Sequence, residues 1–277
     1  GLNLYQIGGE IPAGVVNLVN IYETDTGRWM SGTSKPTAVA DATAAVLFGE
    51  IFVPGGRLAD GQPTAVVEAY SPANNAWRPV APLPTAVAGA LTLSNGSLLY
   101  VFGGWDGENY LADAYVYNPG TDVWESLPPM PEGRAFTTGG LLSGKLYVVG
   151  GKNEAGELAV CSYFDPETAI WSTCPEMNQP RAGAGAAVLV NNLLYVIGGG
   201  TGSQTLDSEF YNTELATWQP VSMPMLADDS WYYLAVANIE TRIFVFGGKQ
   251  GESIIDNGYV FSPFVHQTFL PAVGADR

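Results

Sequence analysis

The chain repeats one short pattern six times, and this repetition limits its fold more than any other feature. In each copy a pair of glycines follows an apolar run, and the pairs begin at Gly8, Gly55, Gly103, Gly150, Gly198 and Gly247. An aromatic residue follows each pair after a similar interval, at Tyr22, Tyr70, Tyr117, Phe164, Tyr211 and Phe261. A second aromatic residue comes shortly after the first, at Trp29, Trp77, Trp124, Trp171, Trp218 and Phe269. Chance does not place three landmarks in one register six times, so the chain consists of six similar units.

The apolar runs and the turn formers between them indicate strands. Runs such as "LYVF" (99–102) have the length and the composition of buried strands. Segments such as "NPGTDV" (118–123) lie between the two aromatic landmarks and are typical of a hairpin turn. Glycine (34) and proline (19) punctuate the whole length, which favours many short strands joined by turns. The sequence therefore predicts an all-β fold of repeated sheets, each covered by its neighbours.

The period and the three landmarks together resemble the kelch repeat, in which each copy forms one four-stranded blade of a β-propeller. The resemblance covers essentially the whole chain and implies a single kelch domain over residues 1-277, a six-bladed β-propeller with four-stranded antiparallel blades. Within such a blade the glycines permit close approach of backbone segments. The Tyr and Trp landmarks would fill the wedge between neighbouring blades. Small-residue segments such as 85–93 and 182–190 are the expected innermost strands, because strands converge near the axis.

Two copies depart from this pattern. The first copy lacks the innermost strand, and only eight residues follow Phe269, where ten separate Trp124 from Arg134. In kelch-type rings a C-terminal strand usually closes the first blade. We therefore expect either a first blade without its innermost strand or a closing strand that was trimmed from this chain. In the sixth copy bulky residues replace small ones, so that either this blade packs differently or some of the rings reach the channel mouth; they are Trp231, Tyr232 and Tyr233.

The two cysteines, Cys161 and Cys174, both lie in the fourth copy. If Phe164 faces Trp171 across a hairpin, the two cysteines are directly opposed on one face of it. Cross-strand neighbours of this kind are close enough for a disulfide. A disulfide favours an oxidising compartment, whereas an accidental pair of thiols is the alternative. A zinc site is excluded, because two cysteines without further ligands cannot complete one.

Charge and composition limit the partners and the location of the chain. The formal net charge of −16 disfavours nucleic acid, which needs concentrated Lys and Arg, and serves either solubility or a cationic ligand. No run of about 18 apolar residues is present, so we expect no membrane insertion. The four lysines and abundant Gly, Thr, Ser and Asn suit a secreted or cell-surface bacterial protein, that is, an extracytoplasmic location. The first residue is Gly1, so we expect a monomer or a part of a larger polypeptide.

The sequence offers little material for catalysis. Some kelch relatives are copper oxidases that use two Tyr and two His, but this chain contains one histidine, His266, in a predicted turn. A Ser-His-Asp or Cys-His arrangement would also have to use that histidine. The segment "GGGTG" (198–202) is not a phosphate loop, because no helix follows it. We therefore expect no catalytic residue, no metal and no cofactor.

A binding face is the remaining place for an activity. The resemblance implies that ligands meet the end formed by two loop sets, those after the glycine pairs and those leading to each innermost strand. Arg134 and Arg181 match the family's arginine position at the channel rim, where Arg binds carboxylates. Other copies have Val39, Val87 and Asp228 there, so no complete basic ring exists. Trp105 is either an exposed platform or folded over its own loop. The candidate ligand-binding residues are Arg57, Trp105, Asp106, Asn109, Tyr110, Arg134, Lys152, Arg181, Asp228 and Trp231.

Three functions remain open at this point. The first is a non-catalytic binding module, a sensor or adhesion domain that holds a protein or glycan on its loop face. The second is an enzyme resembling the kelch-type sialic-acid mutarotases of the bacterial periplasm, in which Arg134 or Arg181 would act with Asp228 or Glu154. The third, a cytoplasmic substrate adaptor, needs further domains and fits poorly with a disulfide. Likeness of fold alone is weak support for any of them.

Overall fold

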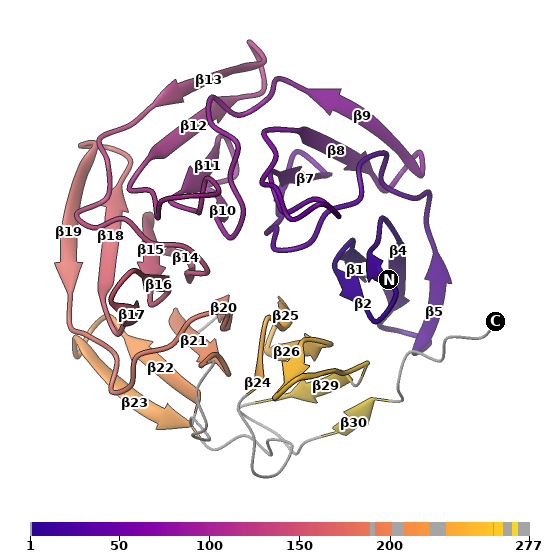
Figure 1. Ribbon diagram of the computed structural model, residues 1–277. Coiled ribbons are helices and arrows are strands. Elements are labelled where there is room, and N and C mark those ends of the chain that lie inside the picture. Colours follow the sequence, from indigo (N-terminus) through magenta and orange to yellow (C-terminus); the bar gives the residue numbers. More distant parts are fainter. Residues whose placement is uncertain are drawn as a thin grey trace. The chain divides into compact units, whose positions relative to one another are not determined.

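A computed structural model of the chain describes residues 2–188, 192–200, 208–221, 231–256, 258–262 and 268–270 (Figure 1). These residues form strands, turns and loops without any helix, which confirms the predicted all-β class. The chain divides into two compact units, Gly1–Phe136 with Phe164–Trp171, and Thr137–Tyr163 with Ser172–Arg277. The single domain over residues 1-277 and its six blades stay predictions. Asp228, His266 and residues 271–277 lie outside the described residues.

The described part of the first unit contains three antiparallel sheets in chain order. The first has three strands, β1 (Asn3–Ile7), β4 (Val19–Glu23) and β5 (Arg28–Ser31). The second has the order β6 (Ala45–Leu47), β7 (Glu50–Pro54), β8 (Val67–Ser71) and β9 (Ala76–Val80). The third has the order β10 (Leu91–Ser94), β11 (Leu99–Phe102), β12 (Ala114–Asn118) and β13 (Val123–Ser126).

Three further sheets of four strands follow among the described residues. The fourth sheet consists of β14 (Thr138–Leu142), β15 (Lys145–Val149), β18 (Cys161–Asp165) and β19 (Ile170–Cys174). The fifth consists of β20 (Gly185–Val188), β21 (Leu193–Ile197), β22 (Ser208–Asn212) and β23 (Thr217–Val221). The sixth consists of β25 (Ala235–Ile239), β26 (Arg242–Phe246), β29 (Gly258–Phe261) and β30 (Thr268–Leu270). Each glycine pair therefore follows the second strand of a four-stranded sheet, or β1 in the first.

The glycine pairs fasten each sheet to the next. Both glycines of every pair have φ in the left-handed region, as at Gly103 (φ 62°) and Gly104 (φ 111°). The second glycine donates its N–H to a carbonyl that precedes the following sheet, for example from Gly104 to Arg134 at 3.0 Å. A Cβ added at Gly103 would collide with that same carbonyl oxygen. Only glycine satisfies both demands, which explains why the doublet repeats.

The landmark tryptophans form a second set of links between successive sheets. Trp77, Trp124, Trp171 and Trp218 each donate the indole N–H to a backbone carbonyl of the segment before the preceding sheet turn, at 2.8 Å in every case. The acceptors are Thr33, Ala81, Pro128 and Pro175. Each tryptophan also packs against the aromatic landmark across its hairpin, with ring centroids 5.0 to 5.3 Å apart. These rings are therefore structural.

A turn residue completes this link in only two of the four cases. The Asn75 side-chain oxygen accepts the Thr33 N–H at 2.7 Å and the Tyr70 hydroxyl at 2.6 Å. Asp122 likewise accepts the Ala81 N–H at 3.0 Å and the Tyr117 hydroxyl at 2.7 Å. In the next two repeats the acceptor of the indole bond is proline, which has no N–H. The turn position there is alanine, at Ala169 and Ala216. Donor and acceptor are lost together.

The first sheet has no innermost strand in the described part of the chain. Here β1 pairs with β4, and no second strand pairs with it. Val46, on the neighbouring β6, is 61% exposed. The corresponding residue of the fifth sheet, Val188, packs where a Cβ on Gly140 of the preceding innermost strand would lie. The exposure of Val46 follows from the missing neighbour, as expected for a first copy without this strand.

Candidate functional site

A short hairpin follows most of the glycine pairs in the described ranges. Three of these hairpins are two-stranded sheets: β2 (Glu10–Ile11) with β3 (Gly14–Val15), β16 (Lys152–Asn153) with β17 (Gly156–Glu157), and β27 (Lys249–Gln250) with β28 (Ser253–Ile254). The other two are closed by single bridges, Arg57 with Pro63 and Trp105 with Tyr110. The polar loops predicted after the glycines are thus ordered hairpins.

The hairpins pair with the segments that lead into the innermost strands. Arg57 bridges Ala40, Trp105 bridges Ala88, and β27 pairs with β24 (Trp231–Tyr232). The two loop sets that the sequence predicts to form one face therefore meet at the same end of each of these sheets. We call the post-glycine hairpin together with the segment paired to it the hairpin end of a sheet. No item of backbone geometry separates the two sets at this end, since they share a ladder of hydrogen bonds.

Arg57 occupies the hairpin end of the second sheet with two carboxylates. Its Nε donates to Asp41 at 2.6 Å and its Nη2 donates to Glu10 at 3.1 Å. Burial disfavours the charge on Arg57, but the hydrogen bonds and charges of the two carboxylates outweigh it and raise the pKa of the guanidinium. Glu10 comes from the hairpin of the first sheet, so this ion pair joins two hairpin ends.

The third hairpin carries four of the predicted ligand-binding residues. Trp105 and Tyr110 are half-buried, and Asn109 is exposed. The Asp106 carboxylate accepts the backbone N–H of Asn109 at 2.7 Å and of Glu108 at 2.9 Å. These bonds lower the pKa of Asp106 and hold the turn of the hairpin. Asp106 therefore shapes the loop, while Trp105 keeps part of its ring at the surface.

Arg181 lies inside its own sheet. It is 1% exposed, its Nη1 donates to the Gly198 carbonyl at 2.7 Å, and its Nη2 donates to Glu209 at 2.7 Å. Lys35 makes the corresponding buried pair with Glu68 in the second sheet, at 2.6 Å. Burial lowers the pKa of Lys35 in spite of Glu68. A buried ion pair of this kind positions the segment before the innermost strand and leaves the Arg181 guanidinium engaged within the protein.

Three further predicted residues are placed as follows. Arg134 is also 1% exposed, and burial lowers its pKa to about 10 although the charge of Glu132 acts to raise it. Trp231 is buried and donates its indole N–H to the Gly247 carbonyl at 2.7 Å. Lys152 is half-buried at the start of β16. Trp231 also accepts the Gly199 N–H, so it fills the position of Arg134 and Arg181. The count of ten residues after the tryptophan, which pointed to Asp228, is corrected by this bond.

Sequence reasoning missed the turn that follows this position. Asp41, Gly89 and Phe136 in the first unit all have positive φ, and each of the last two donates its N–H to the carbonyl of the one before, at 2.7 Å. Gly183 and Tyr233 repeat the arrangement in the second unit. The rings of Phe136 and Tyr233 lie where a Cβ on the preceding glycine would stand. A bulky residue in the left-handed region has no sequence signal, because such residues avoid it.

Two general searches add limits within the described ranges. No group of three or more His, Cys, Asp or Glu side chains there is arranged to hold a metal ion. No helix in that part of the chain is long and apolar enough to cross a membrane. The hairpin ends therefore offer side chains for contact, with aromatic, acidic and basic groups held on short strands.

Comparison with known proteins gives one family. The model of the KLHDC2/KLHL20/DRC7 Kelch-repeats domain matches residues 1–178. Over 80 residues, 29% of this chain, the sequence is 32% identical to beta-scruin of Limulus polyphemus, and over 79 residues it is 33% identical to alpha-scruin of the same organism. Over 87 residues it is 31% identical to the spermatocyte protein spe-26 of Caenorhabditis elegans. The matched regions span 9%, 9% and 15% of the lengths of these relatives.

Proposed function

Because this chain belongs to the kelch-repeat family, we propose that it is a protein-interaction module that binds another polypeptide at the hairpin ends of its sheets. The observation that carries this proposal is the position directly after each glycine pair. It is held by the same backbone geometry from copy to copy, yet its side chain changes each time, through Glu10, Arg57, Trp105, Lys152, Gly200 and Lys249. A scaffold that repeats while one position varies is suited to recognition.

The landmark residues leave no comparable freedom. The glycine pairs are fixed by their positive φ and the carbonyls they approach, and the tryptophans are fixed by their indole bonds. Buried ion pairs engage Lys35 and Arg181 within the fold. The proposed contact surface therefore excludes Arg181 and consists, in the first unit, of the hairpin residues around Arg57 and Trp105. A half-exposed Trp beside charged groups is typical of the residues that dominate protein interfaces.

The engagement of Arg181 by Glu209 bears on the mutarotase alternative. A substrate carboxylate would need an arginine whose guanidinium reaches the surface, and this one is bonded to Gly198 and Glu209. We therefore propose binding without catalysis. The disulfide between Cys161 and Cys174 supports an extracytoplasmic location for the protein, since such bonds persist in oxidising compartments.

A peptide array and a glycan array probed with the purified chain test the proposal. We expect binding to peptides, and loss of that binding by about tenfold or more in Trp105→Ala, the size of effect that an anchor residue gives. The matched control is Phe48→Ala, because Phe48 is 72% exposed in the turn between β6 and β7, at the other end of its sheet. Binding to glycans alone, or equal affinity of Trp105→Ala and the unaltered chain for every bound peptide, would refute it.

A further inference from the structure

The fourth sheet contains a disulfide at a position that other sheets fill with apolar pairs. Cys161 on β18 and Cys174 on β19 are joined across the hairpin, with Cα atoms 5.1 Å apart. In the second sheet the corresponding partners are Val67 and Val80, which face each other in the same register. Two apolar side chains suffice for packing there. The covalent bond in the fourth sheet adds a constraint that the fold itself does not require.

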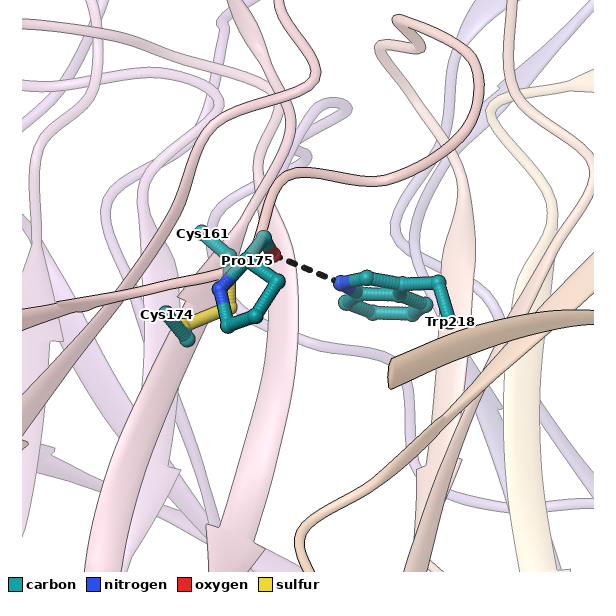
Figure 2. The surroundings of a disulfide bond; sticks show 4 residues. All are labelled: Cys161, Cys174, Pro175 and Trp218. Carbon is teal, nitrogen blue, oxygen red and sulfur yellow. Dashed lines mark hydrogen bonds between the residues drawn. A yellow bond between two sulfur atoms is a disulfide. The ribbon is translucent and has the colours of Figure 1, made fainter. Parts of the chain in front are cut away.

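The disulfide lies directly beside a link between the fourth and fifth sheets. Cys174 is followed by Pro175, whose carbonyl accepts the indole N–H of Trp218 from β23 at 2.8 Å (Figure 2). Cys161 and Trp218 belong to one apolar cluster, with Met177 packed in it. The bond therefore fixes the last residue of β19 at the point where that strand presents its carbonyl to the next sheet.

This link is weaker than its counterparts in one respect. The Thr33 and Ala81 segments are held twice, by the indole bond and by the bond from their own N–H to Asn75 or Asp122. Pro175 has no N–H, and Ala216 stands at the turn position. The disulfide takes over the part of the missing bond, because it restrains the residue before the proline.

We propose that Cys174 is a site of thiol–disulfide exchange, and that reduction of the disulfide releases the Pro175–Trp218 link. Cys174 is partly exposed, whereas Cys161 is 1% exposed within the apolar cluster. An attacking thiolate therefore reaches the Cys174 sulfur. The reactant is a dithiol reductant, and the direction of attack follows from access to that sulfur.

The exchange has two balanced steps. A thiolate of the reductant bonds to the sulfur of Cys174, the bond between the two cysteines breaks, and Cys161 leaves as a thiolate that takes up a proton. The second thiolate of the reductant then attacks its own sulfur in the mixed disulfide and displaces Cys174, which is also protonated. The reductant is oxidised to its disulfide, and the protein gains two electrons and two protons. On the chain-entropy account, losing a crosslink across 13 residues raises the unfolding equilibrium constant by about 100-fold.

The site of attack is tested with glutathione, which forms a mixed disulfide but has no second thiol. After acid quenching, alkylation and proteolysis, mass spectrometry locates the glutathione. We expect it on Cys174. Glutathione on Cys161, or equal amounts on both cysteines, would overturn the proposed direction of attack.

The release of the link is tested by hydrogen exchange of the indole protons, followed by NMR with and without dithiothreitol. Trp77, Trp124 and Trp171 serve as internal controls, because they make the same bond without a neighbouring disulfide. We expect the Trp218 proton alone to exchange faster, by about tenfold or more. Unchanged exchange at Trp218, or equal acceleration at all four, would contradict a local clamp.

A paired variant separates the chemistry from the packing. Cys161→Val with Cys174→Val reproduces the Val67 and Val80 pair of the second sheet. We expect this variant to show no response of Trp218 to dithiothreitol. If its Trp218 proton still accelerates on adding the reductant, the effect does not pass through the cysteines and the proposal is wrong. The measurement on the unaltered chain decides the question even if the variant does not fold.

Discussion

Replacing Asn75 by alanine should destabilise the chain by removing two hydrogen bonds from one oxygen. The Asn75 side chain accepts the exposed Thr33 N–H and the partly buried Tyr70 hydroxyl, at 2.7 and 2.6 Å. Losing the partly buried bond costs about 1 kcal/mol and the exposed one about 0.5 kcal/mol. Asn75 also has a φ of 47°, which alanine adopts less readily, and this adds about 0.5 kcal/mol. We therefore expect Asn75→Ala to lower the free energy of unfolding by about 2 kcal/mol.

The reverse change in the fourth sheet provides the control. Ala169→Asn puts an amide at the same turn position, with a φ of 56°. There the indole acceptor is Pro128, which has no N–H, and the aromatic landmark is Phe164, which has no hydroxyl. The new oxygen meets neither donor, so the stability should change by less than about 0.5 kcal/mol. Ala216→Asn is intermediate, because Tyr211 has a hydroxyl while Pro175 lacks the N–H.

Urea unfolding followed by tryptophan fluorescence measures all three variants. In thermal unfolding the Asn75→Ala effect corresponds to a fall in Tm of about 4–8 °C for a chain of this size. If Asn75→Ala is neutral, or if Ala169→Asn stabilises as much as Asn75→Ala destabilises, the turn residue does not act through these two donors and the reasoning fails.

The remaining predictions concern a buried charge, a glycine and a tyrosine. Glu209→Gln leaves Arg181 buried without its carboxylate and should cost about 3 kcal/mol in urea unfolding, while the exposed control Glu214→Gln should cost nothing measurable. Gly103→Ala drives a Cβ into the Arg134 carbonyl at a φ of 62°, so the folded fraction measured by circular dichroism should fall at temperatures where the unaltered chain stays folded. Burial and the Asp122 hydrogen bond raise the pKa of Tyr117 to about 12. The neutral phenol is therefore favoured in the folded state, and its contribution to stability is present below pH 10 and is lost as pH rises towards 12. A Tyr117→Phe variant should show a flatter loss of stability over that range, and an equal slope for both chains would contradict the assignment.

The repeat landmarks predicted the strands well, because their causes are local or strictly periodic. A glycine pair marks the end of a strand wherever the backbone must turn left-handed and approach a carbonyl. The hairpin register also placed Cys161 opposite Cys174, and the structure joins them. Period-based reasoning succeeds where one physical demand recurs in every copy.

The candidate site was harder to predict, because its features depend on partners distant in the chain. Arg181 matched a rim position, but its partner Glu209 lies 28 residues later in an otherwise apolar strand. A carboxylate two residues before the aromatic landmark, as at Glu68 and Glu209, is the signal that would have indicated a buried pair. The shift from Asp228 to Trp231 comes from additional residues in the sixth copy, which a fixed spacing does not detect.

Exchanging one hairpin tests the central claim that the hairpin ends bind the partner. Residues 105–110 and 152–157 have the same length and follow a glycine pair at the same distance. A chain carrying the sequence of 152–157 at positions 105–110 keeps the scaffold and changes only the hairpin. Calorimetry with a peptide selected on the array should show an affinity reduced by about tenfold or more, which is about 1.4 kcal/mol, with the urea midpoint unchanged. An unchanged Kd would place the binding surface elsewhere.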